Sequence, residues 1–190
     1  MRGLRAAWPE QVAGVRPGDF VFLDESGVNR AMTRLYARRP RGTRAFGSAP
    51  RNRGENVSIL GALTWPGTLE PMVISGATDG AVFLTCRREV LAPQLRAGAV
   101  VVMDHLGAHR VRGVRELIEA AGARRLYLPP YSPELNPIEM AWSKLKTHLR
   151  RVAARSTQAL DAAIGQGRRA VSAQDARGFF KHCGYPGLLN

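Results

Sequence analysis

Three carboxylates, Asp24, Asp104 and Glu139, are the groups in this sequence best suited to chemistry on a phosphate ester. Carboxylate oxygens are hard ligands for Mg²⁺ or Mn²⁺, and these ions keep water and substrate oxygens in their coordination shell. In a site with two ions roughly 4 Å apart, one ion activates a water or hydroxyl nucleophile and the other stabilises the leaving oxygen. The set therefore indicates phosphoryl transfer assisted by two Mg²⁺ ions, with Mn²⁺ as a substitute.

Each acid, taken alone, also has a purely structural explanation. Asp24 could end a strand as a turn residue, Asp104 could form an Asx turn, and Glu139 could be an ordinary acid on a helix surface. For any one of them this explanation is at least as good as catalysis. It is much weaker for the three together, because it then requires three coincidences.

Two short apolar runs predict the strands that carry the aspartates. Residues 20–23 precede Asp24, and residues 100–103 precede Asp104. Such runs are typical of strands buried on both faces, and an ionised aspartate at the end of one needs a partner for its charge. We therefore expect both aspartates at strand ends.

The helix that carries Glu139 has two candidate starts. Residues 129–133, Pro-Pro-Tyr-Ser-Pro, exclude regular structure, and Ser132 could cap a helix that begins at the next proline. Asn136 could be the cap instead, which places Glu139 at the N3 position of a capping box. We favour Asn136, because Pro137 is tolerated only in the first turn of a helix.

The rest of the chain predicts a mixed sheet with helices between its strands. We expect a strand pair at 57–64 and 69–75, helices at 78–93 (or from 79) and 111–122, a strand at 126–128, and two helices capped by Ser156 and Ser172. Residues 1–18 are expected to be an irregular lead-in, and residues 19–190 one domain. This order predicts an α/β fold, with a mixed five-stranded sheet flanked by helices.

The chain carries a strong excess of basic residues. It has 28 Lys and Arg against 15 Asp and Glu, a net charge of +13, which indicates attraction to a polyanion such as nucleic acid. The alternative is an arginine bias of the kind that high-GC genomes produce.

The basic residues best placed to contact phosphates lie in two regions. The first is an arginine-rich loop or ragged hairpin at 29–53, with a strand near 44–46, and the second is the predicted helix that carries Glu139. A solvated basic surface is the alternative in both regions. The candidate contacts are Arg44, Arg51, Arg53, Lys146 and Arg150.

Cysteine content and hydropathy indicate a location inside the cell. Cys86 and Cys183 are the only cysteines, and they form neither a disulfide framework nor a metal-binding pair. No apolar stretch is long enough for a signal-peptide core or a membrane span. We therefore expect a cytoplasmic protein with no membrane partner.

Three segments of the sequence resemble the motifs of DDE transposases. The 34 residues between Asp104 and Glu139, and the segment Pro-Pro-Tyr-Ser-Pro…Asn-Pro-Ile-Glu, are typical of the bacterial insertion-sequence branch related to mariner elements. The resemblance runs from about residue 19 to residue 185. The three segments are residues 22–27, 101–109 and 128–142.

This resemblance implies an RNase H-like fold and the activity of a transposase. That activity is Mg²⁺-dependent cleavage at transposon ends, followed by strand transfer in which a freed 3′-hydroxyl attacks target DNA. Asp24, Asp104 and Glu139 would be the catalytic, metal-binding triad. The implied partners are transposon-end and target DNA and further copies of the chain, in the bacterial cytoplasm at the nucleoid.

The sequence departs from the family at two points. Asn often follows the second acid, whereas His105 stands there in this chain. Family members also carry an N-terminal helix-turn-helix region that recognises inverted repeats, and only 23 residues precede Asp24. We therefore expect a catalytic domain without that region, arising by truncation or from a split or frameshifted reading frame with an upstream helix-turn-helix product.

His109 and Asn136 are further candidates near the acids. His105 and His109 stand four apart, as zinc ligands on a helix would, but no third ligand lies nearby in sequence. We expect His109 instead to orient a water or to contact a phosphate.

Two other functions remain open from the sequence. A decayed or domesticated remnant would bind DNA without cutting it, and the missing N-terminal region favours that alternative. A stand-alone nuclease with an RNase H-like fold would need no transposon end. The intact set of three acids argues against decay.

Overall fold

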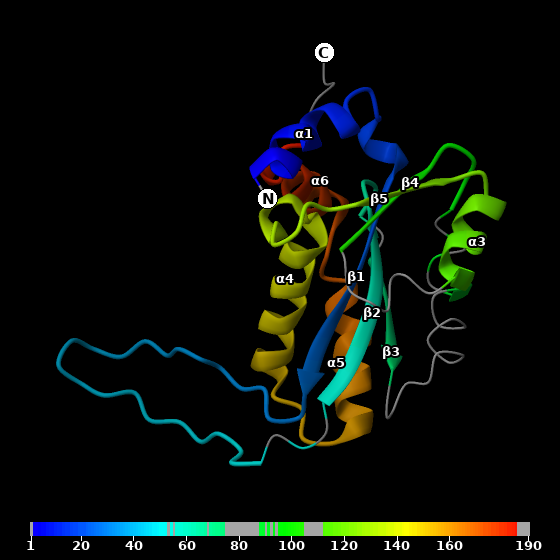
Figure 1. Ribbon diagram of the computed structural model, residues 1–190. Helices are drawn as coiled ribbons and strands as arrows, with labels where there is room; N and C mark the ends of the chain where they lie inside the picture. Colours follow the sequence, from blue (N-terminus) through cyan, green and yellow to red (C-terminus); the bar gives the residue numbers. More distant parts are fainter. Residues whose placement is uncertain are drawn as a thin grey trace.

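A five-stranded mixed sheet forms the centre of the protein (Figure 1). The computed structural model describes residues 2–52, 54, 56–67, 69–74, 88, 89, 91, 93, 95–104 and 112–185. The strands are β1 (Phe20–Asn29), β2 (Asn56–Thr64), β3 (Leu69–Ile74), β4 (Val100–Met103) and β5 (Arg124–Tyr127). Their order is β3-β2-β1-β4-β5, with the first three antiparallel and β1, β4 and β5 parallel. The mixed five-stranded sheet predicted from the sequence is therefore confirmed.

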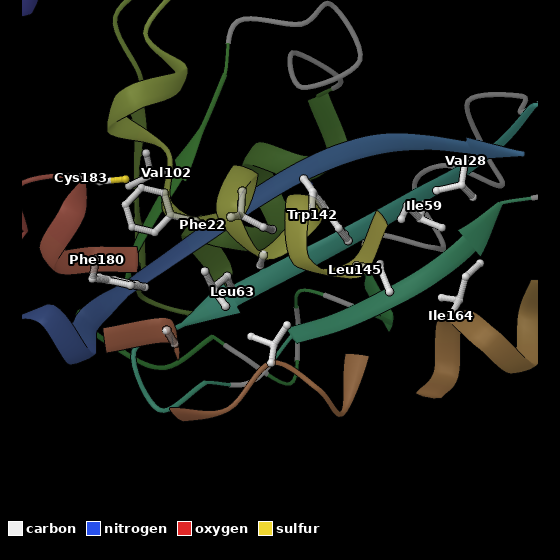
Figure 2. Packing of buried hydrophobic residues seen from close by; sticks show 14 of the residues in the cluster. Phe22, Val28, Ile59, Leu63, Val102, Trp142, Leu145, Ile164, Phe180 and Cys183 are labelled. Atoms are coloured by element: carbon white, nitrogen blue, oxygen red, sulfur yellow. The ribbon is translucent and has the colours of Figure 1, made fainter. Parts of the chain in front are cut away.

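Helices cover both faces of this sheet. They are α1 (Arg2–Val12), α3 (Arg112–Ala120), α4 (Pro137–Val152), α5 (Thr157–Arg168) and α6 (Ala173–His182). Strand side chains alternate between the two faces. Phe22 packs with α4, α5 and α6, whereas its neighbour Leu23 packs with α3. Each face of the sheet therefore has its own hydrophobic core. Figure 2 shows the core on the Phe22 face, with Trp142 and Leu145 of α4 against the sheet.

The N-terminal segment is helical, contrary to the prediction of an irregular lead-in at residues 1–18. Residues 2–12 form helix α1, where an irregular lead-in was expected, and Pro9 lies inside it. Trp8 is 3% exposed, and its indole Nε1 donates to the hydroxyl of Tyr185 at 3.1 Å. Tertiary packing of this tryptophan outweighs the poor helix propensity that proline and glycine give the segment.

Strand β1 is longer than predicted. The strand that contains the apolar run 20–23 was expected to end at Asp24. Instead β1 continues to Asn29, because β2 pairs with it from Val21↔Thr64 to Asn29↔Asn56. Asp24 therefore lies within a strand and not at its end. Asp104, in contrast, directly follows β4, as predicted.

The arginine-rich segment is an extended excursion. Residues 30–52 contain no strand, so the strand predicted near 44–46 is wrong, and most of their side chains are exposed. A strand needs a neighbour for its backbone hydrogen bonds, and this segment runs away from the sheet (Figure 1). Its first residues are held by Arg155, whose guanidinium donates to the carbonyls of Arg30 and Met32 at 2.8 and 2.9 Å.

The predicted helix starts are largely confirmed. Ser156 and Ser172 cap α5 and α6, and their hydroxyls accept from the backbone N–H groups of Ala159 and Asp175. Most of the helix expected at 78–93 lies outside the described residues. Within the part of the chain that the structure describes, no helix is long and apolar enough to cross a membrane.

Asp175 is expected to make the start of α6 sensitive to acid. Its carboxylate accepts from Lys144 Nζ at 2.6 Å and from Ser172, and these hydrogen bonds lower the pKa of Asp175 from 3.8 to about 2. A lowered pKa gives stability that is complete above pH 3.8 and is lost as the pH falls toward 2. We expect Asp175→Ala to lower the free energy of unfolding by about 1 kcal/mol at pH 7.

Denaturant unfolding of Asp175→Ala and the unchanged protein at pH 7 and near pH 2 measures this effect. The difference between the two proteins should shrink at low pH. Asp161→Ala, which removes an exposed acid of α5, is the matched control and should change little at either pH. A difference for Asp175→Ala that does not depend on pH would contradict the role of the carboxylate.

Candidate active site

Asp24 is the most buried of the three predicted acids. Asp24 is 5% exposed. It lies in β1, two residues after Phe22, on the face that packs against α4. The indole Nε1 of Trp142 donates to Asp24 Oδ2 at 3.2 Å. This contact fixes the orientation of the carboxylate relative to α4, because tryptophan in a core has little rotational freedom.

Asp104 lies beside Asp24 because of the parallel pairing of their strands. β1 and β4 are in register from Phe20↔Val100 to Phe22↔Val102, and the two aspartates each follow two residues after the last pair. Side chains two residues apart share a face, and neighbouring strands are about 4.8 Å apart. The register therefore brings both carboxylates to one face, Asp24 within its strand and Asp104 just beyond β4.

Glu139 enters the site from the first turn of α4. The chain leaves β5, passes through the proline-rich residues 129–133 and a short 3₁₀ helix (Pro133–Leu135), and starts α4 at Pro137. Asn136 is the N-cap residue, as favoured from the sequence, but its side chain makes no cap hydrogen bond, so the capping box with Glu139 is not formed. Ser132 stands before the 3₁₀ helix instead, which explains why both residues looked like caps.

The three acids line a single pocket of about 410 Å³. Residues 128–133 and Asn136 complete its wall. Three carboxylates around one pocket match the oxygen ligands that Mg²⁺ and Mn²⁺ prefer. Among the described residues, however, no three acidic, His or Cys side chains come close enough together to hold an ion as they stand. The pocket therefore gathers the predicted oxygen donors around one cavity.

Three of the predicted phosphate contacts lie around a second hollow. Arg51, Lys146 and Arg150 line a depression of about 450 Å³, together with residues 27–29 at the end of β1. Because of these three cations, we call this depression the basic hollow. Arg44 is exposed on the excursion and lines neither pocket. Arg53, His105 and His109 lie outside the described residues.

The two lysines after Glu139 have different surroundings. Lys146, seven residues after Glu139, lines the basic hollow, whereas Lys144 forms the ion pair with Asp175 on α6. The helical spacing predicts this difference, because seven residues return nearly to the same face of a helix and five do not. Lys146 therefore belongs to the same side of α4 as the acid pocket.

Sequence reasoning missed two residues that support the site. Trp142 was assigned only to the core, although a buried indole needs a hydrogen-bond acceptor and Glu139 lies one turn earlier on the same helix. Arg5 lay in the supposed lead-in, yet its Nε donates to Ser132 Oγ at 2.8 Å and its guanidinium pairs with Glu134 at 2.8 Å. No local signal could have indicated Arg5, since the loop it contacts is 127 positions away.

Comparison with known proteins identifies the family. The model of the family described as "DDE superfamily endonuclease" matches residues 19–161, which is most of the chain and includes all three acids. The chain belongs to the DDE superfamily endonucleases. A comparison of the sequence with curated proteins finds no match.

The fold of this DDE endonuclease is RNase H-like and similar to that of the Mos1 mariner transposase. The pre-cleavage Mos1 transpososome superposes with a TM-score of 0.74 at 13% identity, covering 96% of this chain and 58% of that chain. The Mos1 strand transfer complex gives a TM-score of 0.72 at 16% identity, with 96% and 56% covered. The isolated Mos1 catalytic domain gives 0.63 at 11% identity, with 95% and 83% covered. The chain thus spans little more than half the length of the transposase in the transpososome and the strand transfer complex.

Proposed function

We propose that this DDE endonuclease is the catalytic domain of a transposase that cuts phosphodiester bonds at transposon ends and joins a freed 3′-hydroxyl to target DNA. Asp24, Asp104 and Glu139 are its catalytic acids. The observation that carries the proposal is the single pocket lined by these three carboxylates, which come from two neighbouring strands and a helix start. Membership of an endonuclease family and the likeness to Mos1 complexes support the same reading.

The acids of the pocket would hold Mg²⁺, with Mn²⁺ as a substitute. Mos1 paired-end complexes with Mn and with Mg are known, and the carboxylate donors of this pocket have the same preference for such ions. When bound, two ions would supply Lewis-acid activation of the attacking oxygen and stabilisation of the leaving oxygen. Trp142 would hold the Asp24 carboxylate in one orientation during this chemistry.

The basic hollow would bind the part of the DNA backbone that leads away from the acid pocket. Lys146 lies about two turns, or about 10 Å, along α4 from Glu139. Arg51 and Arg150 join it around the same depression. Arg44 and Arg53 would add further phosphate contacts. Cations at this distance would hold phosphates next to the one that is cut, and would offset their repulsion from the acids.

The proposal includes partners beyond the chain itself. Mos1 forms paired-end complexes with transposon ends, and we propose a homo-oligomer on paired ends here. Recognition of one end sequence would come from a helix-turn-helix product of the same element. His109 would contact a water or a phosphate, and Asn136 would contribute to the wall beside the acids. The DNA substrate would place the protein in the cytoplasm at the nucleoid.

The direct test of the proposed function is cleavage of labelled DNA. The protein is incubated with the inverted-repeat ends of its element and Mg²⁺ or Mn²⁺, and cleavage is followed on a denaturing gel. We expect cutting at the repeat end with either ion, none with EDTA, and none by Asp104→Ala. Binding without cutting would indicate a non-catalytic remnant, and equal cutting of an unrelated branched DNA would indicate a stand-alone nuclease.

The basic hollow has its own expected result. Replacing Arg51, Lys146 and Arg150 together by Gln should weaken DNA binding and reduce the slope of log K against log salt by about 0.9 for each lost phosphate contact on a duplex. Replacing Arg169, Arg177 and Lys181 together by Gln, three exposed cations at the end of α5 and on α6, is the control with the same change of net charge. Fluorescence anisotropy over a salt series measures both sets. An equal change in slope for the control would show that the effect is one of net charge alone.

A further inference from the structure

An exposed tyrosine stands at the mouth of the acid pocket. Tyr131 lies in the proline-rich loop before α4, is 84% exposed, and lines the pocket together with Asp24, Asp104 and Glu139. An aromatic ring is costly to leave in water, because most of its surface is apolar. Because the ring lies at the mouth of the proposed cleavage site, we expect a group of the bound substrate to cover it.

The backbone of Tyr131 is held in an unfavourable conformation. Its φ is +54°, in the left-handed region that residues with a Cβ rarely adopt. Prolines flank Tyr131, at positions 129 and 130 before it and at position 133 after it. Because proline fixes its own φ and restricts the residue before it, the loop has few other conformations available. Strain of this kind persists only where the surroundings impose it, and it is concentrated at functional sites.

Arg5 of α1 imposes this conformation. Its guanidinium donates to the carbonyl of Tyr131 at 2.5 Å, its Nε donates to Ser132 Oγ at 2.8 Å, and it forms an ion pair with Glu134 at 2.8 Å. The planar fork of arginine suits several simultaneous acceptors, which a lysine cannot reproduce. One side chain thus contacts three residues of the loop: Tyr131, Ser132 and Glu134.

The far end of the same loop is fixed from the other side. The hydroxyl of Tyr185 donates to the carbonyl of Leu135 at 2.6 Å and accepts from Trp8 of α1. Burial raises the pKa of Tyr185 well above its ordinary value, so its hydroxyl keeps the proton that it donates. The loop is therefore pre-organised before any substrate arrives, with the Tyr131 ring presented to solvent.

We propose that Tyr131 is a substrate-contacting residue whose ring stacks on an unpaired DNA base next to the phosphate in the acid pocket, and that Arg5 is its positioning residue. This inference rests on the proposed function for the identity of the substrate. Stacking suits an exposed, rigid ring, because every base presents a π face to it. The base must be unpaired, since a base within a duplex is already stacked on both faces.

Binding of single-stranded DNA tests the stack without any cleavage. The probe is an oligo-dT of about 12 nucleotides with one 2-aminopurine, within the length that single-strand sites cover, in buffer with EDTA. Anisotropy gives the affinity and 2-aminopurine quenching reports the stack. Tyr131→Asn removes the ring but tolerates the left-handed backbone, so folding is preserved. We expect it to lose most of the quenching and about ten-fold in affinity, the effect of one base–aromatic stack.

Two further variants make the result specific. Tyr131→Phe keeps the ring and should bind and quench like the unchanged protein; if it behaves like Tyr131→Asn, the hydroxyl contacts a phosphate and the stack is wrong. Arg5→Lys keeps the charge but loses the planar fork, and should reduce quenching and affinity only while Tyr131 is present. An equal loss of affinity from Arg5→Lys in the Tyr131→Asn background would overturn the positioning role.

Failure of this inference is distinguishable from failure of the proposed function. Asp24→Asn should keep full quenching of the 2-aminopurine probe while it loses Mg²⁺-dependent cleavage. If the unchanged protein cuts transposon ends but Tyr131→Asn still quenches fully, the stack alone is wrong. If Asp24→Asn cuts DNA normally, the proposed acid site is wrong whatever the quenching.

Discussion

Replacing Asp24 by Asn is expected to lower the rate of Mg²⁺-dependent DNA cleavage by at least about 10³-fold, because in the proposed two-metal site the transition state would lose several kcal/mol of stabilisation when a charged ligand becomes neutral. Asn has the shape of Asp, and its amide oxygen can take the place of the Oδ2 that accepts from Trp142 Nε1, so the core around it should be preserved. Cleavage of labelled end DNA, with a thermal melt of the same preparation, measures both consequences. The melting temperature should change by no more than about 4 °C.

The neighbouring residue on the strand supplies the control. Glu25 follows Asp24 in β1 and so points to the opposite face of the sheet, away from α4. Glu25→Gln removes the same charge from the same strand and should leave cleavage unchanged. Comparable losses for both variants would mean that the charge of the strand matters and not the position of Asp24.

Replacing Gly67 by Ala is expected to lower the free energy of unfolding by about 3 kcal/mol. Gly67 follows β2 in the turn to β3 and has a φ of +95°. A Cβ there would come within 2.6 Å of Ala173 Cα and 2.7 Å of Ala173 N, which belong to the backbone of α6 and cannot rotate away. The expected loss combines a left-handed backbone with overpacking against α6. Denaturant unfolding measures it.

Gly14→Ala separates these two causes. Gly14 also has a positive φ, +76°, but a Cβ at this position would meet no atom within 4 Å. It should therefore cost about 1 kcal/mol, the backbone contribution alone. Equal losses for Gly67→Ala and Gly14→Ala would show that the turn between β2 and β3 is not packed tightly against α6.

The parts of the fold that the sequence predicted well are those set by neighbouring residues. Ser156 and Ser172 could be recognised as caps because a capping hydroxyl bonds to a backbone group three residues later. The run 100–103 indicated a buried strand because four apolar residues in succession suit a position with helices on both faces. The pocket that joins the three acids follows from these elements and from the parallel pairing of β1 and β4.

The features that the sequence did not predict depend on distant partners. Helix α1 exists because Trp8 packs in the core and bonds to Tyr185, 177 positions away. Strand β1 passes Asp24 because β2 accompanies it to Asn29. Among the described residues, none pairs with the strand expected near 44–46, which its composition could not reveal. Local sequence patterns indicate which secondary structure a segment prefers. Contacts between distant segments decide whether the segment adopts it.

The Trp8–Tyr185–Leu135 network also relates the acid pocket to the order in which the protein is made. Leu135 belongs to the loop that walls the pocket, and the tyrosine that braces it is synthesised 50 positions later. A chain still on the ribosome can already contain Arg5 and the three acids, but it lacks Tyr185, which joins the far end of their loop to Trp8 of α1. Synthesis of the three acids therefore precedes completion of their support, and a nascent chain has the acids before it has a finished site.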